Sequence, residues 1–153
     1  GIDDVRYALA LDDDKTLEVA RENIERAGLS DRVSVQAGDA LLDQLGEGYD
    51  FILLSNFVHI YSYEQNREIV QKCARALLPG GRICLKDFFL ESDRTSPVWC
   101  ALFAVNMLVG TEEGNCYTFD EAREWLENAG LALESIQDMA AQSKVILGRK
   151  PSA

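Results

Sequence analysis

The spacing of hydrophobic residues changes several times along this chain, and the changes predict strands and helices in turn. Short apolar or alternating runs are typical of strands, whereas apolar residues that recur every three to four positions are typical of helices. The predicted strands are Tyr7–Leu11, Arg32–Ala37, Phe51–Leu54, Arg82–Leu90, Leu133–Met139 and Lys144–Arg149. The predicted helices are Thr16–Ala27, Tyr63–Leu78, Pro97–Val109 and Thr118–Asn128.

The order of these elements predicts the fold class. Strands and helices alternate, and the continuous apolar run Phe51–Leu54 suits a strand that is covered on both faces. Pro79, Gly80 and Gly81 are expected to end the second helix before the next strand begins. The sequence therefore predicts an α/β protein with a doubly wound, mostly parallel sheet and two closing strands.

Composition narrows the class of protein. At 153 residues and 47% hydrophobic content, the chain is large enough for one domain with a sizeable core. Its formal net charge of -11 opposes binding to nucleic acid. Without an apolar run long enough to span a membrane or a basic, apolar leader at the first residues, we expect a cytoplasmic protein with no membrane partner.

The four cysteines are widely scattered, with no C-x-x-C pair and only one histidine beside them. We therefore expect reduced thiols and no metal site.

Polar side chains stand at or just beyond the carboxyl ends of four predicted strands. Ligands of doubly wound sheets bind at this edge, although solvated loop ends are also rich in aspartate. The candidate residues are Asp12, Asp39, His59 and Asp87.

Four segments resemble one family. They are LEVARENIERAGLSDRVSVQAGD (17–39), YDFILLSNFVHIYS (49–62), ALLPGGRICLKDF (76–88) and YTFDEAREWLENAGL (117–131). The chain resembles class I S-adenosylmethionine-dependent methyltransferases, specifically the small-molecule O-methyltransferases that act on caffeic acid, acetylserotonin or antibiotic precursors. The proline-glycine-glycine segment resembles one that many methyltransferases share, so it indicates only the superfamily. The asparagine-x-x-histidine turn is more specific and indicates the O-methyltransferase families.

The resemblance implies a site for S-adenosyl-L-methionine. Asp12 matches the acid that receives both ribose hydroxyls, and its alternative role is that of a helix cap. Asp39 matches the residue beside the adenine ring, with the backbone amide of Ala40 next to it, and its alternative role is in a turn. The resemblance also assigns Ser55 to cofactor contact.

His59 matches the general base of the family, which removes the proton of an acceptor hydroxyl. Its alternative role is to cap the strand or to pack on Tyr61. Asp87 matches an acid that fixes the histidine tautomer, although the family often has the longer glutamate. Its alternative is an ion pair with Lys86 or Arg94.

The helix of residues 97–109 resembles the wall of the acceptor pocket in the family. Phe103 and Met107 lie on one face with Trp99, and Asn106 is expected to offer a hydrogen bond to the substrate. An apolar stripe of this kind is equally consistent with core packing. A second acid that plant members carry near the histidine falls at Cys116, so a two-acid arrangement is not expected.

The glycine-rich loop that opens this domain in the family is not found in the sequence. We therefore expect residues 1–153 to form part of a catalytic domain, from a longer protein that is a homodimer, and expect the chain alone to bind the cofactor weakly. The predicted reaction is methyl transfer to a hydroxyl of a small aromatic or polyketide-like acceptor. The alternatives are a non-catalytic relic or interaction domain and, with less support, a nicotinamide dehydrogenase.

Overall fold

The computed structural model describes residues 7–11 and 14–152, and the chain divides into two compact units, Gly1–Gln44 and Leu45–Ala153. The described helices are all too short or too polar to cross a lipid bilayer. The four predicted helices and five of the six predicted strands are confirmed as elements, with small changes at their ends. The predicted strand Arg82–Leu90 is divided into two strands, Leu77–Asp87 and Phe89–Leu90.

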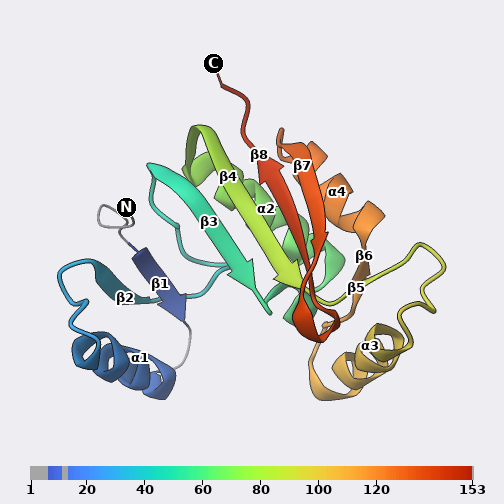
Figure 1. The fold of residues 1–153 in the computed structure, drawn as a ribbon, viewed down its shortest axis with the longest axis horizontal. Helices are drawn as coiled ribbons and strands as arrows, with labels where there is room; N and C mark the ends of the chain where they lie inside the picture. The colour runs from blue at the N-terminus through green and yellow to red at the C-terminus, as the bar shows by residue number, and fades with distance from the viewer. Residues whose placement is uncertain (1–6, 12–13, 153) are drawn as a thin grey trace. The chain divides into compact units, whose positions relative to one another are not determined.

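The first unit is a strand, a helix and a second strand. These elements are β1 (Tyr7–Leu11), α1 (Asp14–Arg26) and β2 (Val33–Ala37) (Figure 1). The two strands are parallel, and α1 packs against both of them. On α1, Leu17 is buried and Ala20 and Ile24 are half-buried, whereas the rest of the described helix surface is exposed. Burial of these three residues explains why this sequence forms a helix at this position.

The second unit is built on a four-stranded sheet in the order β3-β4-β8-β7. Two further short strands, β5 and β6, form a separate parallel pair. The strands are β3 (Tyr49–Ser55), β4 (Leu77–Asp87), β5 (Phe89–Leu90), β6 (Tyr117–Thr118), β7 (Ala132–Asp138) and β8 (Lys144–Arg149). The helices are α2 (Tyr63–Ala76), α3 (Val98–Gly110) and α4 (Phe119–Asn128), with a short 3₁₀ helix, η1 (Val58–Ile60).

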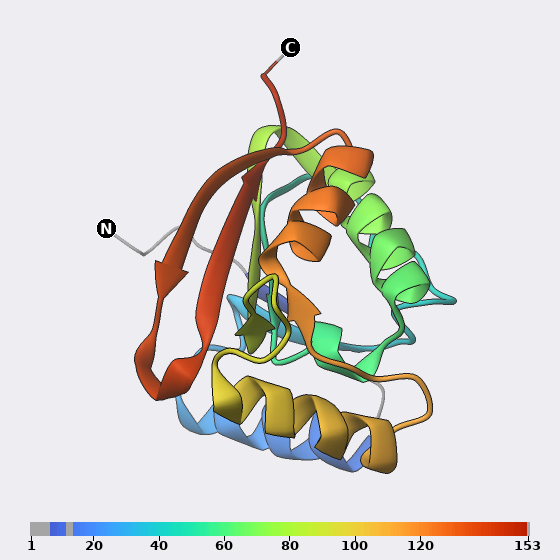
Figure 2. The same ribbon diagram turned by 90° about the vertical axis from the view of Figure 1, so that its right-hand side faces the viewer.

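Helices α2 and α4 lie on the same face of the four-stranded sheet (Figure 2). Each begins with a capping box in which a hydroxyl and a side chain three residues later satisfy backbone amides, Ser62 with Gln65 and Thr118 with Glu121. The core lies between the helices and the sheet, and its largest fully buried side chain is Trp125. Helix α3 packs instead against β5 and η1.

The α/β class is confirmed, but the strand directions need one correction. Strands β3 and β4 are parallel, whereas β8 runs antiparallel to both β4 and β7. The connection from β7 to β8 contains only a short 3₁₀ turn, and a connection of that length cannot return the chain for a parallel pairing. The four-stranded sheet is therefore mixed.

The expected role of the proline-glycine-glycine segment was wrong. Helix α2 ends at Ala76, and Pro79–Gly81 lies inside β4. Gly80 has a φ of 78°, and a Cβ at Gly81 would come within 2.9 Å of the Leu78 carbonyl oxygen. The two glycines therefore permit a sharp bend within an extended segment, where a side chain would be strained or blocked.

One edge of β1 and one edge of β3 have no partner strand among the described residues. Such an edge leaves backbone amides and carbonyls without a partner strand.

Candidate active site

The chain passes from β3 to η1 through a turn in which one residue has a left-handed backbone conformation. Asn56, directly after β3, has a φ of 51°, which asparagine tolerates better than most residues. Its backbone amide donates to the Lys86 carbonyl oxygen at 2.8 Å, and its Oδ1 accepts from Lys86 Nζ at 2.7 Å. The turn is thereby anchored to β4, and His59 follows within η1.

His59 and Asp87 form a hydrogen-bonded pair. His59 Nδ1 lies 2.8 Å from Asp87 Oδ1, and the two side chains are 13% and 1% exposed. Because a carboxylate only accepts hydrogen bonds, Nδ1 carries the proton of this pair. In the neutral imidazole, Nε2 is then the free acceptor.

Asp87 also holds the backbone that carries the histidine. Its Oδ2 accepts from the amides of Phe57 at 3.0 Å and His59 at 3.3 Å, and its Oδ1 accepts from the Phe88 amide at 2.8 Å. A buried carboxylate needs such donors, because burial without them costs free energy. The shorter aspartate therefore reaches the ring from the end of β4, and its orienting role in catalysis stays a prediction.

Lys86 and Arg94, the alternative ion-pair partners expected for Asp87, bind other side chains. Lys86 binds Asn56 Oδ1, and Arg94 pairs with Glu121.

Aromatic side chains from α3 and from Phe88, between β4 and β5, surround the imidazole. The rings of His59 and Phe103 meet in a T-shaped contact, with centroids 5.1 Å apart. Phe103 in turn stacks on Trp99 at 5.1 Å and meets Phe88 at 5.0 Å. These contacts limit rotation of the imidazole and leave its surroundings largely apolar.

Two residues that the sequence analysis missed hold the segment around His59. Asn66 Nδ2 donates to the carbonyl oxygens of Val58 at 2.8 Å and Tyr61 at 3.2 Å, and the Tyr117 hydroxyl donates to Tyr61 at 2.6 Å. Burial raises the pKa of Tyr117 to about 12, so its hydroxyl stays a donor. For Asn66, the sequence signal was a polar residue on the same face of α2 as the apolar Ile69, because a buried polar side chain needs hydrogen-bond partners.

Cys116 stands where the resemblance to the family implied a second acid in plant members. Its side chain is fully buried, and burial raises the pKa of its thiol to about 12, with Cys100 and Asp87 acting in the same direction. The thiol is therefore neutral and does not replace a carboxylate near His59.

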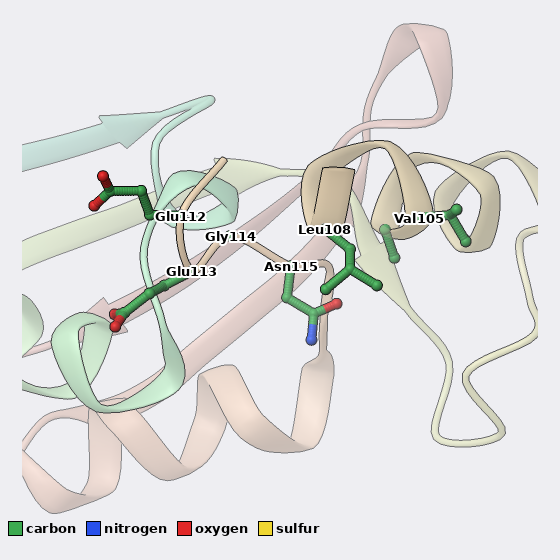
Figure 3. Close-up of a pocket in the computed structure, with 7 residues that line it drawn as sticks. Val105, Leu108, Glu112, Glu113, Gly114 and Asn115 are labelled. Atoms are coloured by element: carbon green, nitrogen blue, oxygen red, sulfur yellow. The ribbon is translucent and has the colours of Figure 1, made fainter. Parts of the chain in front are cut away.

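The predicted acceptor residues on α3 lie in different surroundings. Phe103 faces His59, Asn106 is exposed, and Met107 is half-buried with its carbonyl oxygen bound by Thr111. A hollow of about 320 Å³ beside α3 is lined by other residues (Figure 3). They are Ala104, Val105, Leu108, Glu112, Glu113, Gly114 and Asn115. Contact of Phe103, Asn106 and Met107 with a substrate therefore stays a prediction.

The predicted cofactor residues are only partly described. Asp12 lies outside the described residues. Asp39 Oδ1 accepts from the amides of Leu41 at 2.7 Å and Leu42 at 3.2 Å, as expected of a turn aspartate. Asp39 belongs to the first unit and His59 to the second, so the expected convergence of the two side chains stays a prediction.

Ala40 is half-buried in the turn after β2, and Ser55 is exposed at the end of β3. Both lie at the carboxyl ends of strands, and their contact with the cofactor stays a prediction.

The family described as O-methyltransferase domain matches residues 7–132. One curated relative is 3-hydroxy-5-methyl-1-naphthoate 3-O-methyltransferase of Streptomyces sahachiroi, 39% identical over 73% of this chain and 32% of its own length. Another is aclacinomycin 10-hydroxylase RdmB of Streptomyces purpurascens, 37% identical over 77% of this chain and 31% of its own length.

Solved structures give the same relationship. An O-methyltransferase family 2 protein from Planctomyces limnophilus, in complex with apigenin, is 33% identical with a TM-score of 0.87 over 95% of this chain and 42% of that one. The structure of PigF with SAH is 28% identical with a TM-score of 0.82 over 94% of this chain and 43% of that one, and a PigF among the curated relatives comes from Serratia sp.. This chain thus spans about a third of the two curated relatives named above.

Proposed function

The chain belongs to the O-methyltransferase domain family, and on that premise we propose that it transfers a methyl group from S-adenosyl-L-methionine to a hydroxyl of a small aromatic acceptor. The observation that carries the proposal is the His59–Asp87 pair, with Nδ1 and Oδ1 2.8 Å apart. It lies at the carboxyl ends of the neighbouring parallel strands β3 and β4, where α/β folds bind their ligands.

His59 is the general base in this proposal. Asp87 holds the proton on Nδ1, so Nε2 is the atom that receives the proton of the acceptor hydroxyl. A phenol has a pKa near 10, so at neutral pH its oxygen is a poor nucleophile until the proton is removed. His59 and Asp87 end the step as an imidazolium–carboxylate pair, which their hydrogen bond stabilises.

The residues present fit the cofactor in part. When bound, S-adenosyl-L-methionine supplies a methyl group on a positively charged sulfur. Asp39 is exposed at the end of β2 and uses Oδ1 for the turn, and no hydrogen bond to its Oδ2 occurs within the described residues. That oxygen is available for the adenine amine. The structural similarity to PigF with SAH supports the same cofactor here.

The acceptor proposed for this site is a flat aromatic molecule. The ring cluster of Phe88, Trp99 and Phe103 next to His59 offers surfaces on which such a molecule can stack. The naphthoate substrate of the Streptomyces sahachiroi relative and the apigenin complex of the Planctomyces limnophilus protein support this class. The catalytic gain would come mainly from aligning the acceptor oxygen with the methyl group, with proton removal by His59.

The test uses this chain and a chimera in which the N-terminal part of the Streptomyces sahachiroi relative precedes Gly1. Each is incubated with methyl-labelled S-adenosyl-L-methionine and a set of hydroxynaphthoates and flavonoids, and products are analysed by mass spectrometry. We expect the chimera to add a methyl group, and His59→Ala to lower kcat by about 10²-fold or more without changing cofactor affinity. His59→Ala with full activity would show that the base assignment is wrong.

Two other products of the same assay would overturn the reaction itself. Addition of an oxygen atom would place the chain with the hydroxylase among its relatives. No product from the chimera with any acceptor, despite bound cofactor, would favour the non-catalytic alternative.

A further inference from the structure

The turn that follows α3 is folded around one hydroxyl. Thr111 Oγ1 donates to the Met107 carbonyl oxygen at 2.7 Å and accepts from the Gly114 amide at 2.8 Å. The Thr111 amide donates to the same Met107 oxygen at 3.0 Å. The hydroxyl therefore ties the end of α3 to the turn Thr111–Asn115 and sets the direction in which its last amides point.

One of those amides points at the backbone of His59. The Asn115 amide donates to the His59 carbonyl oxygen at 3.0 Å. Gly114 is buried, and a Cβ added there would lie 2.4 Å from that same oxygen and 2.4 Å from Thr111 Oγ1. Real Cβ atoms do not come this close, so any side chain at Gly114 must move the His59 backbone or the turn.

His59 is thus held at three places by separate elements. Asp87 binds the ring Nδ1 and the amide, Phe103 makes a T-shaped contact with the ring, and the turn after α3 binds the carbonyl. The same turn lines the hollow of about 320 Å³ beside α3, where Figure 3 shows Gly114 between Glu113 and Asn115. Helix α3 therefore contacts His59 through Phe103 and through the turn at its end.

We propose that the turn Thr111–Asn115 is a positioning element for His59, with Gly114 required because its missing side chain lets the Asn115 amide reach the His59 carbonyl. The catalytic meaning of this inference rests on the proposed function, whereas its structural part does not. Displacing the carbonyl rotates η1 and moves Nδ1 away from Asp87, which weakens the preference for one tautomer.

The structural test uses the only histidine in the sequence. In the untagged chain labelled with ¹⁵N-histidine, the two ring nitrogen shifts report one imidazole and its tautomer. We expect Gly114→Ala to convert a single Nδ1-protonated form into a mixture. The matched control is Gly110→Ala in the same region, where a Cβ has nothing within 4 Å, and it should leave the spectrum unchanged.

A second pair of variants keeps the test decisive if Gly114→Ala does not fold. Thr111→Val preserves the shape and removes the hydroxyl that binds Gly114, and Thr111→Ser keeps it. We expect a changed tautomer population in Thr111→Val and the wild-type spectrum in Thr111→Ser. Wild-type ring shifts in Thr111→Val, or in a folded Gly114→Ala, would overturn the proposal.

The catalytic test uses the chimera. We expect Gly114→Ala to lower kcat about tenfold or more, with an unchanged KM for the cofactor, because a small misplacement of a base has a large effect on rate. An unchanged kcat would contradict the positioning role. If the unaltered chimera transfers no methyl group, the proposed function fails, and the tautomer comparison still decides the structural part.

Discussion

His59 Nδ1 lies 2.8 Å from Asp87 Oδ1, although 28 residues separate the two in the sequence. The pair forms because β3 and β4 are neighbouring parallel strands whose carboxyl ends lie at the same edge of the sheet. The histidine follows one strand and the aspartate ends the other.

Replacing Asp87 by asparagine should lower kcat by about 10²-fold or more and leave KM for the acceptor nearly unchanged. An amide can donate as well as accept, so the variant no longer requires a proton on Nδ1. Steady-state kinetics of the chimera measures the effect. A rise of about 10²-fold in KM with an unchanged kcat would show instead that Asp87 serves substrate binding.

Asp87→Ala should also lower the free energy of unfolding, by about 3 kcal/mol, because the amides of Phe57 and Phe88 lose their acceptor. Urea unfolding of the 153-residue chain tests this. Asp120→Ala, at an exposed aspartate, is the matched control, and we expect it to have a much smaller effect.

The left-handed turn at Asn56 predicts a difference between two substitutions. Asn56→Ala must hold a φ of 51° without the Lys86 contact, so we expect a loss of about 1–2 kcal/mol in unfolding free energy. Asn56→Gly accepts that conformation and should lose less. Chemical denaturation of both variants gives the comparison. Equal losses in the two variants would mean that the side-chain contact, and not the backbone conformation, determines the turn.

The capping boxes at Ser62 and Thr118 should each contribute about 1 kcal/mol to stability. We expect Ser62→Ala and Thr118→Ala to lower the midpoint of urea unfolding, because each leaves an amide of the first helical turn without its acceptor. Ser62→Thr and Thr118→Ser retain the hydroxyl and serve as controls. Alanine variants as stable as wild type would show that water replaces the caps.

The buried cysteines predict a loss of stability at high pH. Burial raises the pKa of Cys73 from an ordinary value of 9.0 to about 12, so the thiol ionises more easily in the unfolded chain. Its stabilising contribution is complete below pH 9 and is lost as the pH rises toward 12. Urea unfolding at pH 8 and pH 10 should show the decrease, and Cys73→Ala should reduce it.

Thiol labelling gives an independent check on the same cysteines. All four are free and buried, so a thiol reagent at pH 8 should react slowly with the native chain and quickly in denaturant. Rapid reaction of Cys73 in the native state would contradict its burial.

Local patterns in the sequence were sufficient to predict the four helices and the longer strands, but not the two-residue strands β5 and β6 as separate elements. Apolar residues at helical spacing within residues 16–27 identified a helix, and the continuous run Phe51–Leu54 identified a strand. Periodicity succeeds here because it records which face of an element is buried. It does not record the direction of a pairing partner, which is why the antiparallel position of β8 was not predicted.

The residues of the candidate site were identified one at a time, because a family resemblance assigns roles to positions. His59 and Asp87 were identified in this way, and their hydrogen bond follows from the parallel pairing of β3 and β4. The sequence by itself therefore determined the elements, the acidic composition and the candidate chemistry. Only the tertiary structure decided that Asn66, Gly114 and Asn115 hold the histidine segment, because packing between distant elements brings their atoms together.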